Sequence, residues 1–100
     1  MAQKNKIQFS EEELTEKARI FAMAGDEVRL KILCYLFEGG EPCVSEISEK
    51  IGKSIAATSH HLQLMQQSGL LYTERKGNNI CYKFNENKRT KELKKIICEL

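Results

Sequence analysis

The sequence predicts a mainly α-helical domain with one small β-hairpin (α+β), in the order four helices, two strands and a last helix. Residues 44–51 form a short amphipathic pattern that Gly52 closes, and Ser54 then caps a helix rich in small and polar side chains. A basic hairpin with Arg75 and Lys76 near its tip follows directly. A short helix, a tight turn, a second helix and a hairpin in this order are typical of the winged helix-turn-helix.

The first two helices are marked by their caps. Ser10-Glu11-Glu12-Glu13 is a capping box that begins one helix, and Gly25 ends it. Asp26 can cap the next helix, which Gly39-Gly40-Glu41-Pro42 breaks. The apolar stripe of the first helix is Leu14, Ala18, Phe21 and Ala22, and that of the second is Val28, Ile32, Leu33, Leu36 and Phe37.

The third and fourth helices make the helix-turn-helix. We expect Val44, Ile47 and Ile51 to point inward from the third helix. We expect the same of Thr58, Leu62 and Met65, at i, i+4 and i+7 of the fourth. The opposite face of the fourth helix holds Ser54, Ala56, Ala57, Ser59, His60 and Gln63. Small and polar side chains let a helix lie close to base edges in the major groove, although an ordinary amphipathic surface helix has the same pattern.

The hairpin is predicted from Leu70–Thr73 and Ile80–Phe84, joined by a tight turn at Gly77-Asn78. Arg75, Lys76 and Asn78 at its tip are candidates for contacts to phosphate or the minor groove, and Lys53 at the helical turn for a contact to the DNA backbone. His61 has two interpretations, a phosphate contact or a structural imidazole, and we favour the structural one.

The last predicted helix carries Leu93, Ile96, Ile97 and Leu100 as an i, i+3, i+4, i+7 stripe. So apolar a terminal helix needs a partner surface. Pairing with a second copy of the chain, helped by the first helix, would supply it.

Length and charge limit the class of protein. One hundred residues make a single domain, 1–100, and no apolar run approaches the roughly 20 residues that a membrane span needs. We therefore expect a soluble, cytoplasmic protein whose Cys34, Cys43, Cys81 and Cys98 are reduced thiols. Residues 1–49 hold 6 basic and 10 acidic side chains, whereas residues 50–95 hold 10 and 3. The basic part contains the fourth helix and the hairpin, which favours a phosphate-facing surface over a merely solvated one.

From about Phe21 to Phe84 the chain resembles the ArsR/SmtB family of dimeric winged-helix repressors. Residues 24–33 resemble that family's L-A-D-P-T-R-L-x-I-L opening, and residues 41–47 its E-L-C-V-C-D-L segment. Residues 54–62 resemble S-Q-S-T-V-S-H-H-L, and residues 69–71 with 80–84 resemble G-L-V and V-Y-Y-R-L. The resemblance implies a homodimer that binds an inverted-repeat operator in double-stranded DNA.

The resemblance also bears on the inducer. Members that sense arsenite or cadmium use a Cys-Val-Cys pair, but Ser45 stands at the second position here, so Cys43 lacks a neighbouring thiol. The last helix offers Glu92 and Glu99 but no His for the family's zinc site. No metal site is therefore assigned. A site of unusual geometry for arsenite or another soft metal, with Cys43 joined by Cys34 or a thiol of a second chain, is the alternative.

Cys34 and Cys98 resemble the cysteines of the family's persulfide-sensing branch (the SqrR, BigR and HlyU type), with one Cys in the second helix and one late in the last. The stretch from Tyr82 to Cys98 is about one helical turn shorter than in that branch. A thiolate could attack a sulfane sulfur, and a second thiol could then close a bridge. Beyond about 7 Å between Cα atoms only a longer polysulfide chain could span the pair. The alternative is that both are small buried hydrophobic residues. Cys43 and Cys81 are interpreted as structural or incidental.

The sequence argues against two other classes of protein. A winged-helix protein-interaction module would keep the fold without binding DNA, and the basic segment argues against it. An enzyme is not expected, because no paired carboxylates, nucleophile triad, phosphate loop or metal constellation is present, and no cofactor is implied. Ser59-His60 is an adjacent pair whose side chains diverge on a helix. The sequence thus predicts a homodimeric repressor released by an inducer that acts on thiols.

Overall fold

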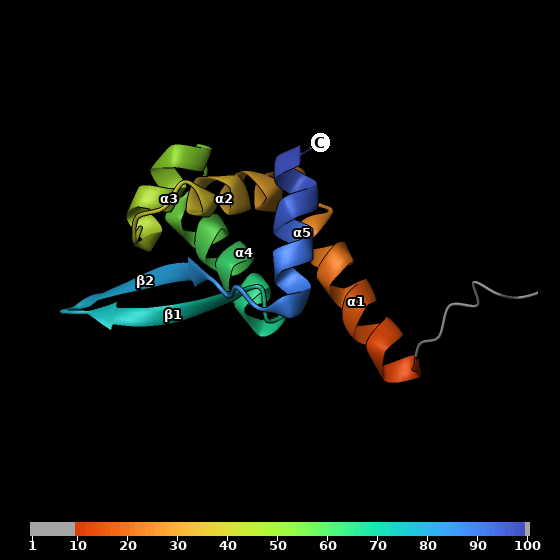
Figure 1. Cartoon of the computed structure of the whole chain (residues 1–100). Helices are drawn as coiled ribbons and strands as arrows, with labels where there is room; N and C mark the ends of the chain where they lie inside the picture. Colours follow the sequence, from red (N-terminus) through yellow and green to blue (C-terminus); the bar gives the residue numbers. More distant parts are fainter. Residues whose placement is uncertain (1–9, 100) are drawn as a thin grey trace, which may run out of the picture.

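A computed structural model describes residues 10–99 as five helices and one antiparallel hairpin, which confirms the predicted fold class. The order is α1 (Glu11–Ala24), α2 (Glu27–Phe37), α3 (Val44–Ile51), α4 (Ile55–Gln67), β1 (Leu71–Lys76), β2 (Asn79–Phe84) and α5 (Lys88–Glu99). Figure 1 shows the hairpin projecting from one side of the helical body and α1 projecting from the other. No helix within residues 10–99 is long and apolar enough to cross a membrane.

The predicted caps begin the first two helices. Ser10 Oγ accepts a hydrogen bond of 3.0 Å from the Glu13 N–H, and the Glu13 carboxylate accepts one of 3.2 Å from the Ser10 N–H. An Asp26 carboxylate oxygen accepts one of 3.1 Å from the Arg29 N–H. These bonds satisfy backbone donors that have no partner inside a helix, so the start of each helix is specified locally.

The same bonds predict a loss of stability in acid. The hydrogen bond from Ser10 lowers the pKa of Glu13 below its ordinary 4.5, and the one from Arg29 lowers the pKa of Asp26 below 3.8. A carboxyl whose pKa is lower in the folded chain stabilises the fold above its unfolded pKa, and that contribution is lost as the pH falls through the folded pKa. We expect the free energy of unfolding, measured with urea, to fall from about pH 5 to about pH 3. Asp26→Asn keeps a cap without a titrating group, so its decline should be smaller; an equal decline would contradict this role.

The core lies between α2, α3 and α4 and the base of the hairpin. Its fully buried side chains include Ile32, Leu33, Ile47, Leu62, Met65 and Leu70. This confirms the inward positions predicted for α4, including Thr58, and most of those predicted for α2 and α3. Val28, Phe37 and Val44 are half-buried and pack against the same cluster. Helix α4 therefore packs against the core along its whole inward stripe.

The stripe predicted for α1 does not pack inside the chain. Leu14, Ala18, Phe21 and Ala22 are exposed, whereas Ile20 and Ala24 are the buried residues of α1. In α5, Leu93 is buried and Ile97 half-buried, but Ile96 is 47% exposed; Leu100 lies outside the described residues. Only the C-terminal part of α1 reaches the core, and periodicity cannot tell a face that packs within one chain from a face that another surface must cover.

The hairpin is longer and slightly shifted from the prediction. Its register pairs Leu71 with Phe84 and Lys76 with Asn79, so residues 74–76 belong to β1 although they are polar. Gly77 has φ +62° at the first turn position, as a type II′ turn requires, and Asn78 completes the predicted two-residue turn. Pairing with β2, rather than strand propensity, extends β1 to the tip.

Candidate nucleic-acid interface

The turn between α3 and α4 sets the direction of α4. Gly52 ends α3 in the left-handed conformation with φ +71°, and the Lys53 N–H donates to the Ser48 carbonyl at 3.1 Å. Ser54 Oγ then accepts a hydrogen bond of 3.1 Å from the Ala57 N–H and begins α4. The left-handed residue would be strained with a side chain, which explains the glycine.

The outward face of α4 contains the predicted candidates. Exposed in the chain are Lys53, Ser54, Ala56, Ala57, His60 and Gln63, while Ser59 is half-buried. The opposite stripe is packed into the core, so this face has a fixed orientation. A helix anchored in this way presents its small and its polar side chains on one outward face, as close approach to base edges requires.

Ile55 is a candidate that sequence reasoning missed. It is 57% exposed at the first position of α4. Its place three residues before Thr58 would assign it to the inward stripe, but the first turn of α4 extends beyond the core. An exposed apolar side chain beside Ala56 could contact a thymine methyl group. Its exposure is a tertiary property that helical spacing does not report.

His61 faces α2 rather than solvent. Its Nδ1 lies 3.3 Å from Arg29 Nη1, and Arg29 Nε donates to the Met23 carbonyl at 2.8 Å. Because arginine can only donate, Nδ1 is the acceptor in this contact. The ring therefore links α4 to Arg29 of α2, which in turn binds the C-terminal end of α1, and this supports the structural interpretation of His61.

The wing is the hairpin of β1 and β2, and the two basic side chains near its tip, Arg75 and Lys76, differ in their surroundings. Lys76 forms an ion pair with Glu41, which Lys83 also approaches at 3.6 Å. For Arg75, no acidic partner lies within ion-pair distance among residues 10–99. Arg75 and Asn78 are both exposed. Arg75 is thus the wing cation available to a phosphate, whereas Lys76 would have to leave Glu41 first.

Half of the basic side chains in residues 50–95 lie outside the DNA-facing part of the chain, although the sequence predicted them there. Five of the ten Lys and Arg residues in 50–95 belong to α5 and not to the helix-turn-helix or wing. Of these, Arg89 forms an ion pair with Glu16 of α1, and Lys94 lies 3.8 Å from Glu86. The charge excess is therefore divided between the wing side and the terminal helix, because charge counting along a chain does not show which surface a residue occupies.

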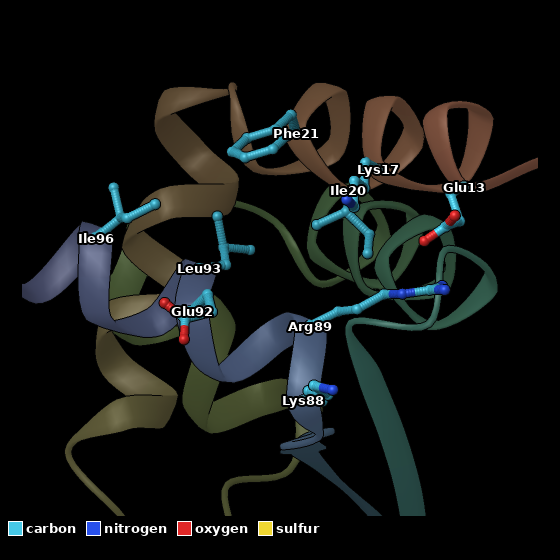
Figure 2. A pocket seen from close by; sticks show the side chains of 9 residues that line it. All are labelled: Glu13, Lys17, Ile20, Phe21, Lys88, Arg89, Glu92, Leu93 and Ile96. Carbon is cyan, nitrogen blue, oxygen red and sulfur yellow. The ribbon is translucent and has the colours of Figure 1, made fainter. Parts of the chain in front are cut away.

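A groove runs between α1 and α5, with a volume of about 560 Å³. Figure 2 shows its apolar side chains, Ile20 and Phe21 of α1 and Leu93 and Ile96 of α5, with charged side chains beside them. Phe21 is 57% exposed. The charged lining residues are Glu13, Lys17, Lys88, Arg89 and Glu92. An apolar strip of this kind with a charged rim is typical of a surface that binds another protein.

The four cysteines occupy different surroundings. Cys34 and Cys98 are exposed, so the alternative that they are small buried hydrophobic residues is wrong for the single chain. They line separate depressions, Cys34 with Tyr35 of α2 and Cys98 with Lys95 of α5. Cys43 is half-buried and Cys81 buried. Among residues 10–99, no three His, Cys, Asp or Glu side chains gather as a metal site would require.

Comparison with known proteins identifies the family. Residues 26–73 match the model of the bacterial regulatory proteins of the arsR family. An HTH-type transcriptional regulator of Methanocaldococcus jannaschii is 34% identical over 90 residues, which cover 89% of this chain and 99% of the relative. The arsenical resistance operon repressor of Escherichia coli K12 is 34% identical over 67 residues, 67% of this chain but 57% of that repressor's length.

Solved structures agree with these matches. The structure of reduced HlyU from Vibrio cholerae superimposes with a TM-score of 0.73 at 28% identity, over 87% of this chain and 86% of that one. The relatives are named as transcriptional regulators, so the protein is a regulator and not an enzyme. From the helix-turn-helix, the wing and these matches, the chain belongs to the arsR family of bacterial regulatory proteins and is a DNA-binding transcriptional repressor.

Proposed function

We propose that the protein is a homodimeric repressor that binds an inverted-repeat operator and releases it when an inducer modifies Cys34 and Cys98. The observation that carries the DNA-reading part is the exposed, firmly anchored face of α4 beside a wing with an available cation. We assign base contacts to Ser54, Ala56, Ala57, Ser59, His60 and Gln63, and backbone contacts to Lys53, Arg75, Lys76 and Asn78.

The homodimer is supported by the groove between α1 and α5. Exposed Leu14 and Phe21 of α1 and Ile96 of α5 leave apolar area in water, which costs about 25 cal/mol per Å². A two-fold axis beside these helices would cover the same side chains on both copies. A dimer also supplies the two α4 helices that half-sites about 34 Å apart require.

The thiol part is supported by exposure. Both Cys34 and Cys98 are accessible to a small sulfane-sulfur compound, as a sensing thiol must be. Cys34 belongs to α2, which packs on α3, and Cys98 to α5 in the proposed dimer interface. A polysulfide bridge between these helices would change the spacing of the two α4 helices and weaken simultaneous docking.

A fluorescence-anisotropy titration tests the proposal by measuring affinity for a DNA fragment from the promoter of the gene that encodes this protein. The titration compares three samples: fully reduced protein, protein treated anaerobically with inorganic polysulfide, and the treated protein after re-reduction. We expect tight binding, loss and recovery, with Cys34→Ser and Cys98→Ser insensitive to polysulfide. Reduced protein that shows no salt-dependent binding would instead support the interaction-module alternative.

A soft-metal inducer is the second candidate. The Escherichia coli relative is named as an arsenical resistance operon repressor. Because no three candidate ligands gather within residues 10–99, such a site would need Cys43 together with thiols of a second chain. Three results together would favour this candidate. Polysulfide should leave operator binding unchanged, arsenite should abolish it, and the Cys43→Ser protein should still bind the operator in the presence of arsenite.

Arg75→Ala is expected to weaken binding to operator and unrelated DNA alike. Removing one phosphate contact should lower the slope of log affinity against log salt by about 1, because one fewer counterion is released. Titrations at several salt concentrations measure this slope. His60→Ala is the comparison: it should change which bases are preferred at one or two operator positions while the slope stays the same. An unchanged affinity and slope in Arg75→Ala would show that the wing is wrongly assigned.

A further inference from the structure

Cys43 and Cys81, which the proposed sensing reaction does not use, face each other across a short β-bridge. The backbone before α3 pairs antiparallel with β2, and the paired residues are these two cysteines. The Tyr82 N–H donates to the Pro42 carbonyl at 3.2 Å next to them. That bond belongs to the pair Pro42 and Tyr82. The next pair, Cys43 and Cys81, is therefore a non-hydrogen-bonded pair of the antiparallel bridge.

This position brings side chains close together. Residues opposite each other at a non-hydrogen-bonded position have Cα atoms about 4.5 Å apart and side chains on the same face. A disulfide needs Cα atoms about 4.4–6.8 Å apart. The pairing geometry therefore suits a disulfide without movement of the backbone.

An ion pair supports a shared face for these side chains. Continuing the register of the single bridge by two residues places Glu41 opposite Lys83 of β2. The Lys83 Nζ lies 3.6 Å from a Glu41 carboxylate oxygen. Because side chains alternate along a strand, Cys43 and Cys81 lie on the same face as this ion pair.

The two thiols differ in access. Cys43 is half-buried at the start of α3, with its Sγ 3.2 Å from Ser45 Oγ, whereas Cys81 is only 5% exposed. A small oxidant can reach Cys43, and Cys81 is protected from solvent but adjacent to it. This is the arrangement of an attacking thiol and a resolving thiol.

We propose that Cys43 and Cys81 form a reversible disulfide in response to a peroxide and thereby fasten the wing to the start of α3. Hydrogen peroxide oxidises the Cys43 thiol to a sulfenic acid, and its O–O bond breaks with release of one water. The Cys81 thiol attacks the sulfenic sulfur, the S–S bond forms, and a second water leaves. Two electrons pass from the two thiols to the peroxide, and a dithiol reductant reverses the step.

The bridge would close a loop that contains all of α3, all of α4 and β1. Closing a loop of this length restricts the unfolded chain and stabilises the fold, while the wing can no longer separate from α3. The oxidised protein should therefore be harder to unfold, and it should unfold like the reduced protein again after reduction.

The test uses the full chain with Cys34→Ser and Cys98→Ser, so its outcome is independent of the proposed persulfide sensing and of DNA binding. The protein is treated with hydrogen peroxide, remaining thiols are alkylated, and peptides are mapped by mass spectrometry without reduction. We expect a linked Cys43–Cys81 peptide, loss of both alkylatable thiols, and a melting temperature higher by at least about 5 °C that dithiothreitol reverses.

Two variants in that background complete the design. Cys43→Ser should leave Cys81 unlinked and alkylatable after unfolding, and should show no rise in melting temperature with peroxide. Cys81→Ala should allow Cys43 to reach a sulfenic acid that dimedone traps. Links between two chains in place of the internal one, or thiols that both remain alkylatable after peroxide, would overturn the proposal.

Discussion

Phe21→Glu is expected to separate the proposed dimer into monomers and to abolish tight operator binding. Phe21 is 57% exposed in the single chain and lines the groove between α1 and α5. A carboxylate there would be buried in an apolar contact, once on each copy, and burying an unpaired charge is strongly unfavourable.

The loss of affinity should be large because two connected α4 helices bind as one unit. Separating them turns one bivalent contact into two independent ones, and we expect affinity for a full operator to fall by about 100-fold or more. Sedimentation velocity gives the oligomeric state and anisotropy the affinity. Thr15→Glu is the matched control, since Thr15 is exposed on α1 and does not line the groove. A Phe21→Glu protein that stays dimeric would place the interface elsewhere.

The features that sequence predicted well are those that neighbouring residues determine. Ser10, Asp26 and Ser54 cap helices through bonds to residues three positions on, so their patterns can be read directly. The inward stripe of α4 follows from spacing alone. The tight turn at Gly77 is equally local.

The features that it did not predict depend on distant contacts. Cys43 and Cys81 are separated by α3, α4 and β1, and only the pairing of β2 with the segment before α3 brings them together. Ile55 and Phe21 are apolar residues in helical register, yet both stay exposed because the core does not extend to them. Glu41 and Lys76 likewise meet only when the wing folds back beside the loop after α2. Contacts and ion pairs between segments that are distant in the sequence leave no periodic signal in it.

Adjacent residues of α4 should separate stability from recognition. Leu62 is fully buried and Gln63 is exposed. Leu62→Ala removes buried methyl groups and leaves a cavity, so the free energy of unfolding should fall by about 2–5 kcal/mol. In a domain of this size that corresponds to a melting temperature lower by more than about 10 °C. Gln63→Ala should change the free energy of unfolding by less than about 0.5 kcal/mol.

Operator affinity should show the reverse order. If Gln63 contacts a base edge, its removal costs about 1–3 kcal/mol of binding to the preferred operator and relaxes the preference at that base pair. Leu62→Ala, measured well below its melting temperature, should bind with nearly the affinity of the unchanged chain because the outward face of α4 is intact. Melting is compared at one protein concentration, since association stabilises the fold by mass action. A Gln63→Ala protein with unchanged operator affinity would remove Gln63 from the reading face, and a Leu62→Ala protein with unchanged melting would show that α4 is not anchored through its inward stripe. The two measurements together decide whether one helix both completes the core and reads the operator.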